Sequence, residues 1–306
     1  MKILVVGSSN TDHFIRLKSL PKPGETVSGG IYYSGLGGKG ANQAVAARRL
    51  GSEVSFVCKL GKDAQGEAAR QSFEQEGLDT SYVFSTDGLH SGVAFILVDE
   101  QAENSIAVAA GANSDLMPED IDRIGNIQDY RVILTSLEIP METVRHLSGV
   151  ARRHGIPLIL NPAPAPKEPL PPDILAAATI VTPNETEIST LSGVPVHDEG
   201  TAVQAASAFR ALGAREIVVT LGQKGALVSD GRPGTEMIPS FSVPAIDTTG
   251  AGDIFNAALA VGLAERMDLR KAVRFAAAAS AISVTRRGAM PSAPFRKEVE
   301  HFLATH

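Results

Sequence analysis

The chain has 306 residues, of which 43% are hydrophobic, so one large domain with a sizeable core is expected. Its net charge is −6 and its charged residues are interspersed, which gives no support to a nucleic acid or an anionic membrane as a partner. The only cysteine, Cys58, excludes an internal disulfide, and no apolar run is long enough for a signal peptide or a membrane span. We therefore expect a cytoplasmic protein.

The first predicted element is a strand over residues 2–6, a continuous apolar run that is typical of a strand buried on both faces. Asn10 and Asp12 follow at its expected carboxyl end. Ligands of open α/β sheets bind at that edge, so both residues are candidates to contact a polyhydroxylated ligand. An Asx turn that closes the strand is the simpler explanation of the same residues.

Two β-rich segments then interrupt the α/β pattern. Residues 14–34 show turn signals without a helical period, and residues 91–109 indicate a hairpin with a polar turn. Together they predict one small sheet that projects from the main domain, formed by residues 12–35 and 91–109, and such a sheet could act as a lid. Its exposed edges need cover, so we expect a homodimer through these segments.

A glycine-dense stretch, residues 35–44, lies between these segments and leads into a helix. It lacks the phosphate-loop motif, because Tyr33 occupies the first glycine position and Gly40 follows the lysine where Ser or Thr is needed. It also lacks the dinucleotide fingerprint, because Gln43 stands at the third glycine position. The stretch is therefore interpreted as a glycine hinge followed by the start of a helix. Lys39, at this helix start, either neutralises phosphate charge or is simply solvated.

After residue 110, apolar strand patterns alternate with helical ones. This alternation predicts a Rossmann-like, three-layer α/β/α domain with a mainly parallel central sheet. The expected strands cover residues 132–137, 157–160, 179–182 and 216–221, and the expected helices cover 141–154, 184–192, 201–212, 254–265, 269–284 and 295–303.

The stretch from Ile246 to Asn256 is a small-residue turn that runs straight into an apolar, alanine-rich helix. A helix N-terminus leaves backbone N–H groups unpaired and positively polarised, and Gly250 and Gly252 would let a phosphate approach them. Asp253 would repel that phosphate unless it accepts a proton from an attacking hydroxyl group. A helix cap or an ordinary first-turn acid is the alternative.

Two motifs together carry a family resemblance, Gly37–Ala44 and Asp247–Asp253. With them the chain resembles the ribokinase-like carbohydrate kinases, also called the PfkB family, over essentially its whole length. Further ordered similarities lie at Asn10–His13, Pro23–Thr26, Asn161–Pro164, Thr182–Glu187 and Val284–Ala289. The resemblance implies a single kinase domain over residues 1–306 that forms a homodimer.

The resemblance implies ATP-dependent phosphorylation of D-ribose at its 5-hydroxyl, giving D-ribose 5-phosphate and ADP. Asp253 would be the catalytic base, and the backbone amides of Gly250, Ala251 and Gly252 would form the anion hole. The sugar would be held by Asn10, Asp12, Gly38, Lys39, Asn42, Glu138 and Asp253. The amide of Asn10 would favour ribose over 2-deoxyribose, because it can hydrogen-bond a 2-hydroxyl group.

The resemblance also implies ATP, Mg²⁺ and K⁺ as cofactors. Nucleotide contacts would come from Asn184, Thr220, Gly222, Gly225 and Gly252. Glu187 would organise Mg²⁺ and the phosphates, unless it is only a solvated helix residue. The K⁺ site would be formed, in part by backbone carbonyl groups, by Asp247, Thr249, Ser283, Arg286, Gly288 and Ser292. Ala277 departs from the family, where a polar residue often lies near the adenine, and this puts a polar adenine contact in doubt.

Other functions stay open at this point. The nearest is a kinase of the same family for 2-deoxyribose, fructose, 2-keto-3-deoxygluconate or adenosine. A non-catalytic sugar-binding regulator on the same fold is a further alternative, although it would have no need of the base Asp253. A nicotinamide-dependent dehydrogenase is disfavoured, because its glycine fingerprint is absent.

Overall fold

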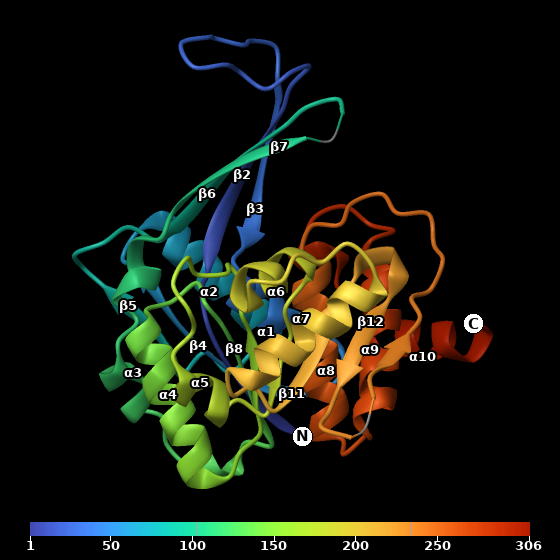
Figure 1. Ribbon diagram of the computed structural model, residues 1–306. Coiled ribbons are helices and arrows are strands. Elements are labelled where there is room, and N and C mark those ends of the chain that lie inside the picture. Colours follow the sequence, from blue (N-terminus) through green and yellow to red (C-terminus); the bar gives the residue numbers. More distant parts are fainter. Residues whose placement is uncertain (102, 233) are drawn as a thin grey trace.

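The computed structural model describes residues 1–101, 103–232 and 234–306 (Figure 1). Within these residues the main sheet has nine strands: β1 (Lys2–Val6), β4 (Glu53–Gly61), β5 (Val83–Thr86), β8 (Val132–Ser136), β9 (Leu158–Asn161), β10 (Ile180–Val181), β11 (Glu216–Thr220), β12 (Ala226–Ser229) and β13 (Glu236–Ile238). Their order is β13-β12-β11-β10-β9-β8-β1-β4-β5. All neighbours from β11 to β5 pair in parallel, and β12 is antiparallel to both of its neighbours.

Helices cover both faces of this sheet, which confirms the predicted three-layer arrangement. Ile3 and Val5 of β1 belong to one apolar core, and Leu4 and Val6 belong to the other, as expected when successive side chains of a strand point to opposite faces. The first core is completed by α1 (Lys39–Arg49), α2 (Ala64–Gln75), α8 (Ala251–Ala264), α9 (Leu269–Ser283) and α10 (Arg296–Thr305). The second is completed by α3 (Pro118–Asp122), α4 (Met141–His154), α5 (Pro172–Ala177), α6 (Glu185–Ser192) and α7 (Glu199–Ala211).

A second sheet of four strands, called here the small sheet, projects from this body (Figure 1). Its strands are β2 (Asn10–Arg16), β3 (Ile31–Gly37), β6 (Gly92–Val98) and β7 (Asn104–Ala109), in the order β3-β2-β6-β7. The β6–β7 pair is the antiparallel hairpin that the sequence predicts, and β2 pairs with β6 in parallel. Ala102, inside the predicted segment 91–109, lies outside the described residues.

The position of Asn10 and Asp12 differs from the expectation. Both lie in the first part of β2, which begins at Asn10, and not in an Asx turn that closes β1. The chain passes through only residues 7–9 between the two strands, so it enters the small sheet without reversing direction. These two side chains therefore lie at the base of the small sheet, where it meets the body.

Further elements escape the sequence prediction. Helix α2 is capped by Asp63, whose carboxylate accepts a hydrogen bond from the backbone N–H of Gly66 at 2.7 Å. Strands β12 and β13 extend the main sheet in a stretch to which the sequence analysis assigns no element. Among the described residues no helix is both long enough and apolar enough to cross a bilayer.

Candidate active site

The N-terminus of α8 offers unpaired backbone amides. Gly250 caps the helix with φ of 75°, and a Cβ atom there would lie 2.7 Å from the Cβ of Ala289, so only glycine fits. The amides of Gly252 and Asp253 have no hydrogen-bond acceptor in the described part of the chain. A Cβ built on Gly252 would meet no atom within 4 Å, so the space in front of these amides is open. This helix end can hold an anion.

Asp253 is buried beside this anion site. Gly250 is the helix cap, so the interpretation of Asp253 as a cap is wrong. Its Oδ2 instead accepts a hydrogen bond from the Nδ2 of Asn42 at 2.8 Å, across a sequence separation of 211 residues. Burial raises the pKa of Asp253, and the Lys39 ammonium group and the Asn42 bond oppose that rise. A carboxylate whose pKa is raised in this way is suited to accept a proton.

Lys39 is a cation that interacts electrostatically with this carboxylate. It is the first residue of α1, and Asp253 raises the pKa of the lysine although burial opposes the shift. Glu138, Glu187 and Asp12 raise it further, so four acidic side chains favour the charged form of one lysine. The Oε2 of Glu138 accepts hydrogen bonds from the Ser8 hydroxyl at 2.5 Å and from the Lys39 backbone N–H at 3.1 Å. Lys39 is therefore not a freely solvated side chain.

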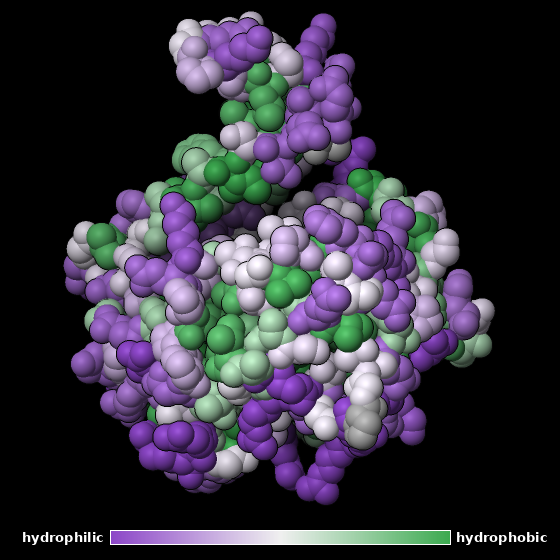
Figure 2. Space-filling model, viewed as in Figure 1, coloured by the Kyte–Doolittle hydropathy of each residue, from purple (hydrophilic) through white to green (hydrophobic). Residues whose placement is uncertain are grey.

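Asp12 brings the small sheet into this cluster. Burial raises its pKa to about 7, and Glu138 and Asp253 add to the rise while Lys39 opposes it. The side chain is 9% exposed, so the surrounding protein replaces most of its water. Figure 2 shows that the surface is hollowed between the small sheet and the body. The predicted sugar residues from β2, α1 and α8 thus meet where the two parts join.

The predicted nucleotide residues lie along the neighbouring strand ends. Asn184 and Glu187 form a reciprocal capping box at the start of α6, with both side chain to backbone bonds at 2.8 Å. Burial raises the pKa of Glu187, while the Asn184 N–H and Lys39 lower it. Thr220 ends β11 and donates its backbone N–H to the Pro183 carbonyl at 3.0 Å. Glu187 therefore caps a helix and also lies within reach of the charge of Lys39.

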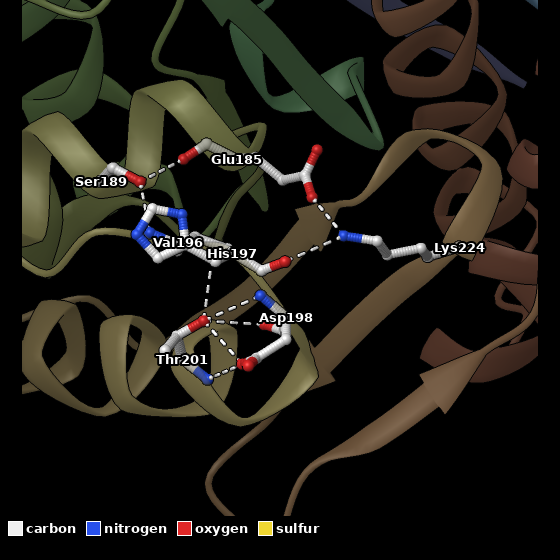
Figure 3. Close-up of polar contacts among 7 residues, drawn as sticks. All are labelled: Glu185, Ser189, Val196, His197, Asp198, Thr201 and Lys224. Carbon is white, nitrogen blue, oxygen red and sulfur yellow. Dashed lines mark hydrogen bonds and ion pairs between the residues drawn. The ribbon is translucent and has the colours of Figure 1, made fainter.

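The loop after β11 is tied to the helices beside it (Figure 3). It contains Gly222 and Gly225, both with positive φ. Between them, the Nζ of Lys224 lies 3.1 Å from Glu185 Oε1 and 3.3 Å from the His197 carbonyl oxygen. These contacts hold the predicted nucleotide loop against the start of α6 and the connection to α7.

The predicted K⁺ residues come together from two segments. Asp247 accepts hydrogen bonds from the Thr249 backbone N–H and from the Gly288 backbone N–H, each at 2.9 Å. Burial would raise the pKa of Asp247, but these bonds and the Thr249 hydroxyl outweigh it and lower the pKa. The Arg286 guanidinium forms an ion pair with Glu298, so the Arg286 side chain is engaged in another interaction. An ionised carboxylate at this position fits a hard cation such as K⁺.

Several polar side chains in the site were not predicted from the sequence. The Nδ2 of Asn256 donates to the Gly252 carbonyl at 2.8 Å, and its Oδ1 accepts from the Thr182 hydroxyl at 2.5 Å. Asn113 contacts both Ser9 and Asn10. Asn256 closes the stretch that the sequence singles out, so its position was a usable signal. Asn113 is distant in sequence from its partners, and no local pattern points to it.

Comparisons with known proteins agree with this geometry. The model of the pfkB family carbohydrate kinases matches residues 1–296. A ribokinase of Haemophilus influenzae is 44% identical, with 98% of each chain covered, and a deoxyribokinase of Salmonella typhi is 38% identical, with 99% of each chain covered. Among solved structures, that of an Arabidopsis thaliana ribokinase complexed with ribose and ATP matches with a TM-score of 0.89 at 32% identity, covering 98% of each chain.

Proposed function

The chain belongs to the pfkB family of carbohydrate kinases, and we propose that it transfers the γ-phosphoryl group of ATP to the 5-hydroxyl of D-ribose, giving D-ribose 5-phosphate and ADP. The observation that carries the proposal is the buried Asp253 carboxylate beside the open amides of the α8 N-terminus. A non-catalytic sugar-binding regulator would need neither feature. The similarity to ribokinases of other organisms supports the choice of sugar.

The mechanism follows from the groups at this helix end. Asp253 accepts the proton of the 5-hydroxyl as its oxygen attacks the γ-phosphorus and the bond to the β-phosphate oxygen breaks. The amides of Gly250, Gly252 and Asp253 stabilise the negative charge on the transferring group, whereas the predicted donor Ala251 already gives its N–H to the Thr248 carbonyl at 3.2 Å. Asn42 holds Asp253 in position through its 2.8 Å hydrogen bond. Lys39 opposes the rise in the pKa of Asp253 that burial causes, and so favours the ionised form that can accept a proton.

The surplus of carboxylates supports Mg²⁺ as a cofactor. Asp12, Glu138, Glu187 and Asp253 all act electrostatically on a single lysine, so a divalent cation bound there would offset the repulsion between these carboxylates and the phosphates of ATP. Glu187 with Asn184 would organise Mg²⁺, which would neutralise charge on the phosphates. Thr220, Gly222 and Gly225 would contact the nucleotide.

A potassium ion near Asp247 would order the turn that leads into α8. Oxygen atoms of Thr249, Ser283, Arg286, Gly288 and Ser292 would complete its coordination. The direct bond from the Gly288 N–H to Asp247 supports this assignment, because it already joins the two segments. Activity is therefore expected to depend on potassium.

The small sheet acts in our proposal as a lid and as the contact of a homodimer. Cross-strand neighbours Tyr33, Phe14, Ile96 and Ile106 form an apolar row across its four strands, and the two end members are 41% and 57% exposed. Exposed apolar rows of this kind are covered in a stable protein. Closure of the sheet on ribose would exclude water, and small-angle scattering that is unchanged by ribose would contradict it.

The cellular setting is part of the same proposal. Cys58 is buried and is the only cysteine, which suits a reducing cytoplasm. The net charge of −6 supports small-molecule substrates rather than a nucleic acid.

The test is ADP release from Mg·ATP with ribose, 2-deoxyribose, fructose, 2-keto-3-deoxygluconate and adenosine, with and without potassium. We expect a strong preference for ribose and a higher rate with potassium. Preference for 2-deoxyribose would favour the second candidate, which the similarity to a Salmonella deoxyribokinase supports. No turnover of any acceptor would favour the regulator.

A further inference from the structure

Asn113 is a buried amide behind the predicted sugar residue Asn10. It lies in the 3₁₀ helix η1 (Gly111–Asp115), which follows the last strand of the small sheet, and it is 2% exposed. Its Oδ1 accepts the backbone N–H of Ser9 at 2.9 Å. Its Nδ2 donates to the carbonyl of Ser9 at 3.1 Å and to the Oδ1 of Asn10 at 2.8 Å.

These bonds leave only one orientation for each amide. The N–H of Ser9 can only donate and its carbonyl can only accept, so the backbone determines which end of Asn113 is oxygen and which is nitrogen. The remaining proton of the Asn113 Nδ2 then requires an acceptor, and Asn10 supplies its Oδ1. The Nδ2 of Asn10 is therefore the end that stays available to a ligand.

The free end of Asn10 belongs to the side of β2 that faces the site. Residues two apart in a strand share a face, so Asn10 and Asp12 project together, and Asp12 interacts electrostatically with Lys39 and Asp253. Gly92 on the neighbouring strand β6 pairs with Asn10 and packs against the two amides. A Cβ atom at Gly92 would lie 2.2 Å from both the Asn10 Oδ1 and the Asn113 Nδ2, so the pair is packed directly against backbone.

We propose that Asn113 is a positioning residue that fixes Asn10 with its amide nitrogen toward the sugar, so that Asn10 donates a hydrogen bond to the 2-hydroxyl of ribose. The inference rests on the proposed function and names the device that selects the sugar. With 2-deoxyribose the fixed donor has no acceptor, and a buried polar group without a partner is unfavourable. Without Asn113 the amide of Asn10 can rotate, and the selection weakens.

The test is a double-mutant cycle read out as the ratio of kcat/KM for ribose to kcat/KM for 2-deoxyribose. Asn113→Ala should lower this ratio about tenfold, mainly through the KM for ribose, because hydrogen-bonding sites discriminate strongly. In an Asn10→Ala background the same change should alter the ratio less than about twofold, because the group through which it acts is gone. Ser114→Ala, on the same 3₁₀ helix and exposed, is the matched control and should leave the ratio unchanged.

Asn113→Asp covers the case in which the alanine variant does not fold. It keeps the acceptor for the Ser9 N–H and loses the donor to Asn10, so the ratio should fall again. A ratio that stays at the wild-type value in the folded Asn113 variants, or that falls equally in both backgrounds, overturns the inference. A wild-type enzyme that selects ribose would leave the proposed function intact in either case, whereas a wild type inactive on both sugars would refute that function itself.

Discussion

The two parts that meet at the site differ in how firmly they are held. Helix α8 is buried from Asp253 to Gly262 and packs between the main sheet and its neighbouring helices, so the Asp253 carboxylate has little freedom. In the small sheet, all of β7 and most of β3 are exposed, while the central strands β2 and β6 are partly buried. Chemistry is thus assigned to a rigid element, and selection of the sugar to an element that can move.

The largest effect on activity is expected from a substitution in helix α8. Asp253→Asn removes the proton acceptor and keeps its shape, so kcat should fall by about 10²–10⁴-fold while calorimetry shows nearly unchanged ribose binding. Asp268→Asn makes the same chemical change at the exposed N-cap of α9 and should leave kcat within about twofold. A variant of Asp253 that keeps most of its kcat would remove this residue from the role of base.

A change in the small sheet should act on assembly and binding rather than on chemistry. Ile106→Asp places a charge at the exposed end of the apolar row, so we expect sedimentation to show dissociation of the dimer and the KM for ribose to rise about tenfold. Leu212→Asp is the matched change at a 47% exposed leucine on the body. If both variants sediment like the wild type, the small sheet is not the dimer contact.

Lys39 should set the pH dependence of kcat/KM. Lys39 lowers the pKa of Asp253, so Lys39→Met should raise that pKa and move the acidic limb of the kcat/KM profile to higher pH. Lys39→Arg keeps the positive charge, so the acidic limb of the kcat/KM profile should stay at the wild-type pH, although the activity of this variant falls. An unmoved limb in the methionine variant would show that the titration belongs to another group.

The smallest effect concerns stability in the absence of ligand. The pKa of Asp12 rises from its ordinary value of 3.8 to about 7 in the folded protein. The stability that protonated Asp12 contributes is therefore fully present below pH 3.8 and is lost as the pH rises through 7. Between pH 4 and pH 8, the loss of stability in urea unfolding should be smaller in Asp12→Asn than in wild type by a few kcal/mol, at about 1.4 kcal/mol per pKa unit. Asp87→Asn, at an exposed ion pair, should keep the wild-type slope. An unchanged slope in Asp12→Asn would contradict the assignment.

More of the body around α8 than of the small sheet could be predicted from the sequence. The apolar run of β1 and the glycine turn before α8 are local patterns with one physical explanation each, and the structure places them as predicted. The start of β2 was misjudged because Asn10 and Asp12 look like turn residues, and only pairing with β3 and β6 makes them part of a strand. Asn113 could not be found, because its bonds to Ser9 span 104 residues.

The most direct test of the account is the identity of the product. Wild-type protein incubated with ribose and Mg·ATP should give a phosphomonoester whose phosphorus resonance is split into a triplet by the two hydrogens on carbon 5. That result would place the transferred group on the hydroxyl that Asp253 deprotonates. A doublet would show transfer to a ring carbon that bears one hydrogen, and no new resonance would show that ribose is not the acceptor; either result would contradict the account.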